Sequence, residues 1–325
     1  MDAMRMDEAL PLVGASESVR ALAAALSEAA GRRGPVLITA EVGCQPDEVA
    51  RALHVLSRGA LPFVAVDCAS ADPGDIERRL FGNAASMRAN DLESVGSAAA
   101  IVEAGSGTLF IDNIDELPAS TQRRLARVLR DAEVRIAGAR TPSAAPFRLA
   151  GATAKDLEVE AREGRFRAEL LRRFATRIGV PPLRQRLPDM PLLLQALAAR
   201  AGRPEVTVTA PALTILSAMP WAGNFDELAS VFTRILAGCD GTVQQEDVLG
   251  LLPIQGSFVR PDLTASLREA RRRFERDYIA AVLEHHQWRM SDAARTLGIE
   301  RANLYRKTRQ LGITRGRSET SMVNR

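Results

Sequence analysis

The feature that most constrains the fold of this chain is the alternation of short apolar runs with amphipathic segments over residues 16–153. Each apolar run has the length of a buried strand, and the segments between them follow a helical period. Strands joined by helices pair in parallel with right-handed connections, so the pattern predicts a parallel sheet covered by helices. The predicted strands are residues 35–39, 62–69, 107–118 and 147–153, and the predicted helices are residues 16–30, 48–57, 74–82 and 119–133.

The rest of the chain is predicted to be helical, in two blocks separated by a linker. Residues 183–252 carry a helical pattern, and residues 253–266 are polar with Pro and Gly, which is typical of a linker. Residues 267–313 are again helical. Residues 1–11 and 314–325 are expected to form a loose leader and a tail.

Basic residues are concentrated toward the C-terminal end of the chain. Residues 259–325 hold 15 Lys+Arg and 8 Asp+Glu, a net charge of +7. The whole chain has a net charge of +3, which leaves −4 for residues 1–258. A basic segment on an acidic body indicates either a nucleic-acid-binding module or a solvated basic tail.

The remaining composition argues against a metal site and against a membrane protein. The three cysteines and three histidines lack the spacing of metal ligands, so no metal site is expected. No apolar window approaches the roughly 18 residues of a membrane span, and the acidic, mixed N-terminus does not resemble a signal peptide. Free thiols are typical of a cytoplasmic chain, which is the expected location.

The loop after the first predicted strand has the outline of a phosphate-binding loop but not its residues. Such a loop needs glycines, whose backbone N–H groups curl around phosphates, and a lysine ahead of a helix N-terminus. The chain reads AEVGCQPDEVA over residues 40–50, where Gly43 is the single glycine and Pro46 stands where a lysine is needed. Proline removes a positive charge and a backbone N–H together. Asp47 and Glu48 suit the helix dipole but repel phosphate.

Several longer stretches, in this order, resemble one known family. They are LVGASESV, VARALH, PFVAVDCA, LFG, GTLFIDNIDELP, GRFRAELLRRF, PPLRQRLPDMPLLL, WAGNFDEL and ARTLGIERANLYRK. The first eight resemble the AAA+ domain of bacterial enhancer-binding proteins, the activators of sigma-54 RNA polymerase. The last resembles the Fis-type helix-turn-helix of the same proteins.

The resemblance implies an α/β fold: an AAA+ parallel-sheet core over residues 12–182 with a helical lid over residues 183–252. An all-α Fis-type helix-turn-helix domain over residues 267–313 follows it. Family members usually carry a receiver or sensory domain in front, for which residues 1–11 are too short. Control is therefore expected through another protein or through expression level.

The family pattern identifies what the loop lacks. The family reads GESGTGKE where this chain reads AEVGCQPD without a gap. Ala40 and Gln45 replace glycines, so their side chains crowd a phosphate or resist positive φ, and Pro46 replaces the lysine. Lys155 matches a different loop and Lys307 lies in the helix-turn-helix, so neither supplies the missing charge. The resemblance implies a vestigial nucleotide site, with ATP or ADP and Mg²⁺ expected only if this atypical site still binds them.

Other matched positions of the site differ as well. Asp112 matches the acid that holds the magnesium water shell, but Asn113 replaces the Glu that polarises the attacking water, and an amide is no general base. Ala154 matches the polar sensor I residue, and Asp226 matches the sensor II arginine with its charge reversed. The alternative for Asp112 and Asp115 is that they cap a helix after a buried strand.

Two arginine positions of the family are kept. Arg167 and Arg173 match the arginine fingers, which act in trans on the γ-phosphate of a neighbouring subunit. Their retention indicates a subunit interface, or ion pairs such as those of Arg167 with nearby acids.

The segment that contacts sigma-54 in the family is rewritten here. The family reads GAFTGA shortly after LFG, whereas this chain lacks the Phe-Thr tip and carries Arg88, Asp91 and Glu93 in that region. Met87 is either a new contact or part of a mobile surface loop. Without the tip and without ATP, remodelling of the sigma-54 closed complex is not expected.

The C-terminal segment contains every part of a helix-turn-helix. Two helices flank a turn at Gly298, preceded by a longer helix over residues 267–286. The long helix is expected to direct one apolar stripe inward: Leu267, Ala270, Phe274, Tyr278, Ala281 and Val282. The apolar residues expected to pack between the two shorter helices are Ala293, Ala294, Leu297, Leu304 and Leu311.

The second short helix carries the candidate DNA-binding residues. Arg301, Asn303, Arg306 and Lys307 are expected to project outward. Arg and Asn read guanine and adenine edges, and Lys suits phosphate. Glu300 at the helix start is expected to weaken the cap and to discourage a close phosphate. The alternative is a basic helical hairpin for protein contact.

These observations predict a DNA-binding transcriptional regulator whose AAA+ domain is a pseudo-ATPase used for assembly or partner binding. Its expected partners are double-stranded DNA, RNA polymerase or an active enhancer-binding paralogue, and further copies of itself, at least as a dimer. Three alternatives stay open: an ATP-dependent sigma-54 activator with an atypical site, a non-hydrolysing partner that modulates an active paralogue, and an adaptor that needs no DNA.

Overall fold

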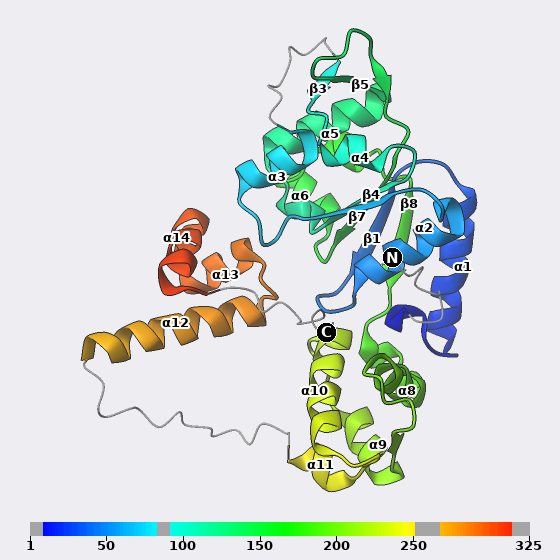
Figure 1. The fold of residues 1–325 in the computed structure, drawn as a ribbon, viewed down its shortest axis with the longest axis vertical. Helices are drawn as coiled ribbons and strands as arrows, with labels where there is room; N and C mark the ends of the chain where they lie inside the picture. Colours follow the sequence, from blue (N-terminus) through cyan, green and yellow to red (C-terminus); the bar gives the residue numbers. More distant parts are fainter. Residues whose placement is uncertain (1–8, 83–91, 251–266, 314–325) are drawn as a thin grey trace, which may run out of the picture. The chain divides into compact units, whose positions relative to one another are not determined.

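The computed structural model describes residues 9–82, 92–250 and 267–313 (Figure 1). The chain divides into two compact units, residues 1–254 (unit 1) and residues 255–325 (unit 2). The linker predicted over residues 253–266 and the tail predicted over residues 314–325 lie outside the described residues. No helix in the described ranges is long and apolar enough to span a membrane.

Unit 1 is built on the predicted parallel sheet. Its five strands lie in the order β2-β4-β7-β1-β8, and every neighbouring pair is parallel. Registers such as Val36 opposite Ala150 and Val66 opposite Ile111 fix the pairing. The strands are β1 Val36–Ala40, β2 Phe63–Asp67, β4 Thr108–Asp112, β7 Arg148–Thr153 and β8 Thr176–Val180.

Helices cover both faces of this sheet because its strands alternate their apolar side chains between two cores. Ile38 of β1 faces a core shared with α1, α2 and the lid, whereas Leu37 faces a core shared with α3 to α7. Strands that are buried on both faces have nearly continuous apolar sequences. The helices of this part are α1 Glu17–Gly31, α2 Pro46–Arg58, α3 Pro73–Phe81, α4 Ala100–Ala104, α5 Ala119–Asp131, α6 Leu157–Arg162 and α7 Ala168–Leu171, with the 3-10 turn η3 Ile114–Glu116.

We use the term lid for the described residues 183–250. The lid is mainly helical, as expected. Its apolar side chains join the core that contains α1 and α2. Its elements are η4 Leu183–Gln185, η5 Leu187–Asp189, α8 Met190–Arg200, α9 Ala210–Ala218, α10 Asn224–Gly238 and α11 Gln245–Leu249.

Two small sheets were not predicted because their strands are too short to show a period. In the lid, β9 Thr207–Val208 pairs in parallel with β10 Thr242–Val243. In the core, β3 Glu93–Val95 pairs with β5 Glu133–Ile136, which pairs antiparallel with β6 Ser143–Ala144.

The expectation of a loose leader is wrong for residues 9–11, and residues 1–8 lie outside the described residues. Leu10 is fully buried at the start of η2 Leu10–Leu12. Its N–H donates to Glu48 Oε2 at 2.7 Å, and the buried Arg186 guanidinium donates to the carbonyls of Leu10, Pro11 and Val13. A buried cation therefore supplies donors to the carbonyls of a short 3-10 turn, whose own hydrogen bonds are few.

The described part of unit 2, residues 267–313, consists of three helices. Its helices are α12 Leu267–His285, α13 Met290–Leu297 and α14 Arg301–Leu311. The turn residue Gly298 has φ 65°, the left-handed conformation that favours glycine. The core contains Ala293, Ala294 and Leu304, with Leu297 and Leu311 packed against it, as predicted.

The expected inward stripe of α12 is only partly correct. Val282 is in the core, together with Ile279 and Leu283, but Tyr278 is 52% exposed and Ala281 is exposed. The side chains of residues 267, 270 and 274 lie outside the described residues. The predicted helical period is therefore correct. The buried face at the C-terminal end of α12 is shifted by one residue from the predicted face, from Tyr278 to Ile279.

His54 links α2 to β4 and gives unit 1 a pH dependence. Its Nδ1 lies 2.9 Å from Thr108 Oγ1, and burial lowers the pKa of His54 below the usual 6.5. A lowered folded-state pKa contributes stability above the unfolded pKa, and that stability is lost as pH falls below about 6.5. We expect the free energy of unfolding from urea titrations to decline between pH 7 and pH 5. The decline should be smaller in His54→Gln, and equal declines in both proteins would contradict this assignment.

Candidate functional site

The candidate nucleotide residues of the sequence meet at one edge of the sheet. Gly43 and Pro46 follow β1, Asp112 and Asn113 end or follow β4, and Ala154 follows β7. Because parallel strands end at the same side, these residues lie along the carboxyl edge, where α/β sheets commonly bind ligands. We call this the carboxyl edge below.

The loop at residues 41–45 enters α2 through a left-handed residue followed by a proline. Gln45 precedes the helix in the left-handed conformation, with φ 53°, where a side chain costs about 1–2 kcal/mol. Pro46 is the first helical residue, so this turn lacks one N–H that an anion could use. Cys44 is fully buried, and burial raises the pKa of its thiol to about 12. The loop therefore presents no thiolate and no lysine.

Asp226 lies beside this loop, as the sequence predicted, and contacts it directly. Its Oδ1 accepts a hydrogen bond from Gln45 Nε2 at 2.8 Å, and its backbone N–H donates to the carbonyl of Gly43 at 3.2 Å. The start of α10 thus touches the loop through a carboxylate where the family has a cation. A carboxylate here repels a phosphate and attracts the loop amide.

The end of β4 does not carry the predicted helix caps. Asp112 Oδ1 accepts the N–H of the next residue, Asn113, at 2.9 Å, and the N-cap of η3 has no side-chain hydrogen bond. Asn113 adopts φ 52° and donates through Nδ2 to Asp67 Oδ1 at 3.0 Å. The amide is therefore engaged by a carboxylate from β2, and it supplies no base for water activation.

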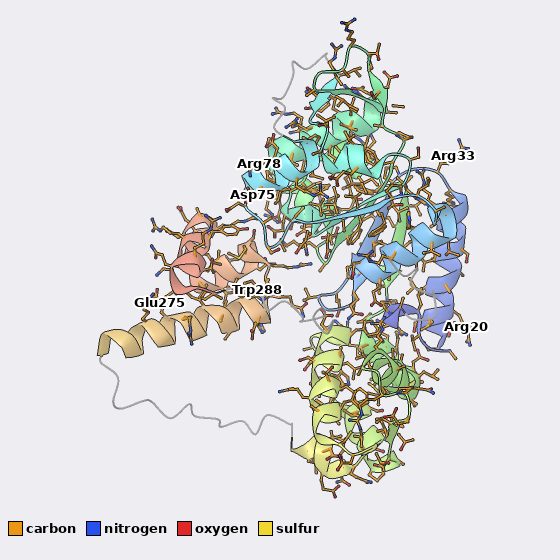
Figure 2. All side chains as sticks on the ribbon, viewed as in Figure 1. Arg20, Arg33, Asp75, Arg78, Glu275 and Trp288 are labelled. Carbon is orange, nitrogen blue, oxygen red and sulfur yellow. The ribbon has the colours of Figure 1, made fainter. Side chains whose placement is uncertain are left out.

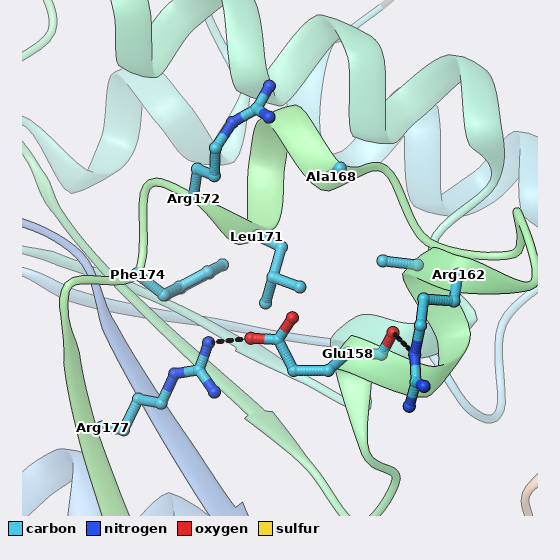
Figure 3. Close-up of a pocket in the computed structure, with 8 residues that line it drawn as sticks. Glu158, Arg162, Ala168, Leu171, Arg172, Phe174 and Arg177 are labelled. Carbon is cyan, nitrogen blue, oxygen red and sulfur yellow. Dashed lines mark hydrogen bonds and ion pairs between the residues drawn. The ribbon is translucent and has the colours of Figure 1, made fainter.

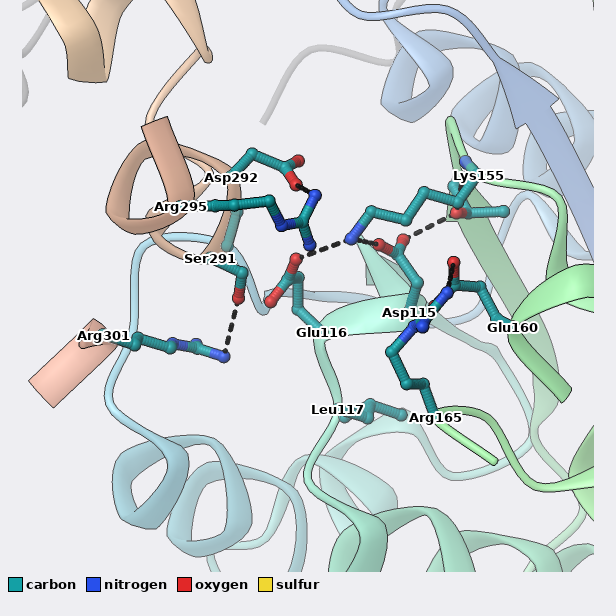
Figure 4. A network of polar contacts seen from close by, with 12 residues as sticks. Asp115, Glu116, Leu117, Lys155, Glu160, Arg165, Ser291, Asp292, Arg295 and Arg301 are labelled. Atoms are coloured by element: carbon teal, nitrogen blue, oxygen red, sulfur yellow. Dashed lines mark hydrogen bonds and ion pairs between the residues drawn. The ribbon is translucent and has the colours of Figure 1, made fainter. Parts of the chain in front are cut away.

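Asp115 is paired with groups from β7 and the residues after it rather than capping a helix. Its Oδ1 accepts a hydrogen bond from Thr153 Oγ1 at 2.6 Å, and Oδ2 lies 3.0 Å from Lys155 Nζ. Lys155 Nζ also lies 3.1 Å from Glu116 Oε1 (Figure 4). Lys155 is thus held by two buried carboxylates, which agrees with the prediction that it does not replace the loop lysine. Ala154, beside it, is exposed and offers no polar group.

The chemistry that this edge offers is that of carboxylates with protein partners. Asp67, Asp112, Asp226 and Glu41 all contribute carboxylates to this edge, and among the described residues Glu41 pairs with Arg184 while Asp226 contacts the Gln45 amide. Three phosphates would add negative charge to an already acidic edge. Among the described residues no cluster of His, Cys, Asp and Glu is arranged to hold a metal ion.

The two retained arginines lie on and after α7. Arg167 is the N-cap of α7 and is exposed, and its backbone N–H donates to Gln122 Oε1 at 2.7 Å. Within the described residues, neither Arg167 nor Arg173 has an ion pair or a side-chain hydrogen bond. The ion-pair alternative for Arg167 is therefore wrong for this part of the chain.

A pocket of about 510 Å³ opens between α6, α7 and β8 (Figure 3). Its lining includes the apolar Leu171 and Phe174 and the cationic Arg162 and Arg172. The Glu158 carboxylate also lines it and pairs with Arg177 at 2.6 Å. Arg167 and Arg173 are not among the residues that line this pocket.

The region rewritten relative to GAFTGA is described only at its C-terminal end. Met87, Arg88 and Asp91 lie outside the described residues. Glu93 is not part of an exposed loop as expected, because it is fully buried in β3 and contacts Arg124 at 2.7 Å and Arg127 at 3.0 Å. A buried carboxylate with two guanidinium partners anchors this segment to α5.

The candidate DNA-binding residues of α14 differ from one another in exposure. Arg306 is exposed, as predicted, and donates to Asn303 Oδ1 at 2.8 Å, whereas Asn303 itself is half-buried. The expectation is wrong for Arg301, which is half-buried and donates to Ser291 Oγ at 3.3 Å and to the Tyr305 hydroxyl at 3.4 Å. Figure 4 shows the Arg301–Ser291 contact.

Lys307 is likewise not free at the surface. Its Nζ pairs with Glu275 of α12, the side chain labelled in Figure 2. Arg309, exposed one turn beyond Arg306, was not singled out from the sequence. The helical spacing of Arg306 and Arg309 was the signal that could have found it. Glu300 makes no side-chain cap to α14, as expected.

Sequence reasoning also missed several partners at the carboxyl edge. Asp67, Arg184 and Asn224 contact Asn113, Glu41 and the loop backbone, respectively. Asp67 ends a predicted parallel strand, so its position at the edge could have been inferred. Arg184 and Asn224 had no such signal because they come from the lid, far along the chain.

Two protein families match this chain in separate segments. Residues 12–178 match the Sigma-54 interaction domain, and residues 270–311 match the Bacterial regulatory protein, Fis family. The chain is 31% identical to the regulatory protein LuxO of Vibrio cholerae, covering 96% of this chain and 63% of that protein. It is 30% identical to the nitrogen assimilation regulatory protein NtrX of Azorhizobium caulinodans, covering 93% and 69%. The chain spans only 52% of the NtrC regulator of Azospirillum brasilense.

Solved structures agree with these matches. NtrX from Brucella abortus in complex with ADP has a TM-score of 0.65 at 30% identity, over 95% of this chain and 71% of that chain. The same protein in complex with ATP has a TM-score of 0.64, over 93% and 69%. The RuvB branch migration motor of Thermotoga maritima, at 14% identity and a TM-score of 0.51, shares the fold.

Proposed function

Because this chain belongs to the family of DNA-binding, sigma-54-dependent transcriptional regulators, with a sigma-54 interaction domain and a Fis-type helix-turn-helix, we propose that it is a regulator with a pseudo-ATPase AAA+ domain. In this proposal the AAA+ domain serves assembly or partner binding, and it does not remodel the sigma-54 closed complex. The helix-turn-helix binds specific sites on double-stranded DNA.

The single observation that carries the pseudo-ATPase proposal is the lysine-free loop at residues 41–45, with carboxylates beside it at the carboxyl edge. Pro46 occupies the first position of α2, where the loop lysine belongs, and the Asn113 amide is bonded to Asp67. Asp226 brings a negative charge to the loop itself. Loss of the phosphate lysine, the water-activating acid and the lid arginine removes the positioning and charge stabilisation on which phosphoryl transfer depends.

An ATP hydrolysis assay tests this proposal. Phosphate release with Mg²⁺ is followed over a range of protein concentrations, so that any activity that requires assembly is detected. We expect release equal to the buffer baseline in both the natural protein and Asp112→Ala. A saturable release that rises with protein concentration and disappears in Asp112→Ala would contradict the proposal.

The second candidate function is an ATP-dependent sigma-54 activator with an atypical site. It is favoured by the NtrX structures in complex with ADP and ATP and by the retained Arg167 and Arg173. This candidate requires ATP and Mg²⁺ at the carboxyl edge, with charge supplied by groups other than a loop lysine. The hydrolysis assay separates it from the pseudo-ATPase.

We assign Arg167 and Arg173 to a surface between copies of this chain. Neither guanidinium group has an ion pair within the described residues, and the two residues flank α7 at its two ends. Arginine is enriched where proteins associate. An active enhancer-binding paralogue is an alternative occupant of the same surface, which fits the role of a non-hydrolysing partner.

On α14 we assign base reading to Arg306 and Asn303 and phosphate contact to Lys307. Arg306 is exposed and oriented by the Asn303 side chain, which suits a bidentate contact with guanine. Lys307 reaches a phosphate only when it leaves Glu275. Arg301 supports α14 by packing against Tyr305 and Ser291.

Glu275→Gln is expected to strengthen DNA binding by releasing Lys307 from its ion pair. One additional phosphate contact steepens the dependence of log affinity on log salt by about 0.9. Fluorescence anisotropy with duplex DNA at several salt concentrations measures both the affinity and the slope. The double variant Glu275→Gln, Lys307→Gln is the control and should lose the gain. Equal slopes for the natural protein and Glu275→Gln would refute the role of Glu275.

A further inference from the structure

The loop at residues 41–45 is joined to the lid by direct side-chain and backbone hydrogen bonds and by an ion pair. Arg184 holds Glu41 through two contacts, Nη1 to Oε2 at 2.5 Å and Nη2 to Oε1 at 2.6 Å. Asn224 Nδ2 donates to the carbonyl of Val42 at 2.8 Å. The contacts extend along consecutive residues of the loop and come from two separate lid elements, η4 and α10.

The second half of the loop is held by one lid residue through two different groups. The Asp226 backbone N–H donates to the Gly43 carbonyl at 3.2 Å, and its carboxylate accepts from Gln45 Nε2 at 2.8 Å. Asp226 therefore contacts both the backbone of Gly43 and the side chain of Gln45. Between these residues, Cys44 is fully buried in the core that also contains Leu183.

Asn224 acts as the junction of these contacts. Its Oδ1 accepts the N–H of Leu183 at 3.0 Å while its Nδ2 binds the loop, and the residue is 1% exposed. It adopts φ 51°, in the left-handed region that Asn tolerates better than most residues with a side chain. Gln45, on the other side of the contact, has φ 53°, where its side chain is less well tolerated. Such a conformation persists only where surrounding contacts hold it.

The ion pair of this set is present at neutral pH. The hydrogen bond from Arg184 lowers the pKa of Glu41 below its usual value, so the carboxylate is ionised well below pH 7. The pair is solvent-exposed, and alone it contributes little. The two parallel contacts between Arg184 and Glu41 fix the relative orientation of these side chains. The buried hydrogen bonds of Asn224 stabilise the same junction between loop and lid.

We propose that these contacts form a clasp, made by Glu41, Gln45, Arg184, Asn224 and Asp226, that holds the lid against the carboxyl edge in one orientation without a nucleotide. The proposal deepens the pseudo-ATPase function and rests on it. A nucleotide shifts a lid only if it binds two lid positions with different affinity. In this chain the protein's own side chains join loop and lid, so the AAA+ domain keeps one shape whether or not ATP is present.

Hydrogen–deuterium exchange of the full chain tests the clasp. The double variant Gln45→Gly, Arg184→Gln removes the amide contact to Asp226 and the ion pair to Glu41, while leaving buried side chains in place. We expect amide exchange to become about tenfold faster in two peptides, one covering residues 41–46 and one covering residues 224–228. Arg177→Gln, which breaks an exposed ion pair with Glu158 away from the loop, is the matched control and should leave both peptides unchanged.

The outcomes separate the clasp from the function on which it rests. Unchanged exchange in both peptides of the double variant would overturn the clasp and leave the pseudo-ATPase proposal intact. Faster exchange in only the loop peptide would also overturn it, because a clasp couples loop and lid. For the natural protein we expect no effect of ATP with Mg²⁺ on either peptide. Saturable protection by ATP would instead contradict the pseudo-ATPase function itself.

Discussion

Replacing Arg186 with methionine is expected to lower the free energy of unfolding by about 3–5 kcal/mol. The guanidinium is fully buried, donates to the Pro11 carbonyl at 2.8 Å, and lies over the ring of Phe225. Methionine fills much of the volume but leaves buried carbonyls without donors. Burial alone would raise the pKa of Asp189, but hydrogen bonds from Ser16 and Ala15 and the charge of Arg186 lower it, so Asp189 also loses its cation.

Urea unfolding followed by the fluorescence of the buried Trp221 measures this loss. The matched control is Arg32→Met, which removes an exposed ion pair with Glu28 and should change the free energy of unfolding by less than about 1 kcal/mol. Similar values for the two variants would show that Arg186 does not hold residues 10–13 against the lid.

Arg306→Ala is expected to weaken binding to the preferred DNA site by about 10- to 100-fold, the loss of one bidentate base contact of roughly 1–3 kcal/mol. Arg306 is exposed on α14, and Asn303 Oδ1 orients its guanidinium at 2.8 Å. The variant should bind its preferred site more weakly but bind unrelated DNA with nearly unchanged affinity, because phosphate contacts carry no sequence information.

Selection from a random duplex library with the natural protein supplies the site for this measurement. The variant should then bind that site and a scrambled duplex with more similar affinities, with preference relaxed at one base position. Arg301→Ala should instead lower the melting temperature of unit 2, because Arg301 contacts Ser291 and Tyr305. Retention of the full preference by Arg306→Ala would contradict the assignment.

The sheet and the composition of the carboxyl edge could be predicted from sequence because both follow from local rules. Apolar runs of strand length joined by helical segments specify a parallel sheet, and parallel strands deliver their next residues to one edge. The family resemblance assigned Pro46, Asn113 and Ala154 to one site, and the parallel sheet explains why they lie at one edge. Asp226 required the family resemblance as well, since nothing in its own segment indicates that α10 meets the loop.

The partners of charged side chains could not be predicted because they depend on elements distant in sequence. Gln45 and Asp226 are 181 residues apart, and Lys307 meets Glu275 from another helix. Helical spacing placed Arg301 and Lys307 on the surface but could not say which neighbour would cover them. The buried Leu10 was missed for the same reason, since its carbonyl partner Arg186 belongs to the lid.

Calorimetric titration of the purified full-length protein with ATP and with ADP, each with Mg²⁺, tests the central claim most directly. The proposed function holds that the lysine-free loop and the carboxylates of the carboxyl edge lack the positive charge that binds the phosphates of a nucleotide. The account predicts no saturable heat of binding up to about 1 mM nucleotide. A binding free energy weaker than roughly −4 kcal/mol corresponds to a dissociation constant above about 1 mM, so the site would stay mostly empty. A saturable isotherm with a micromolar dissociation constant, lost in Asp112→Ala, would contradict it.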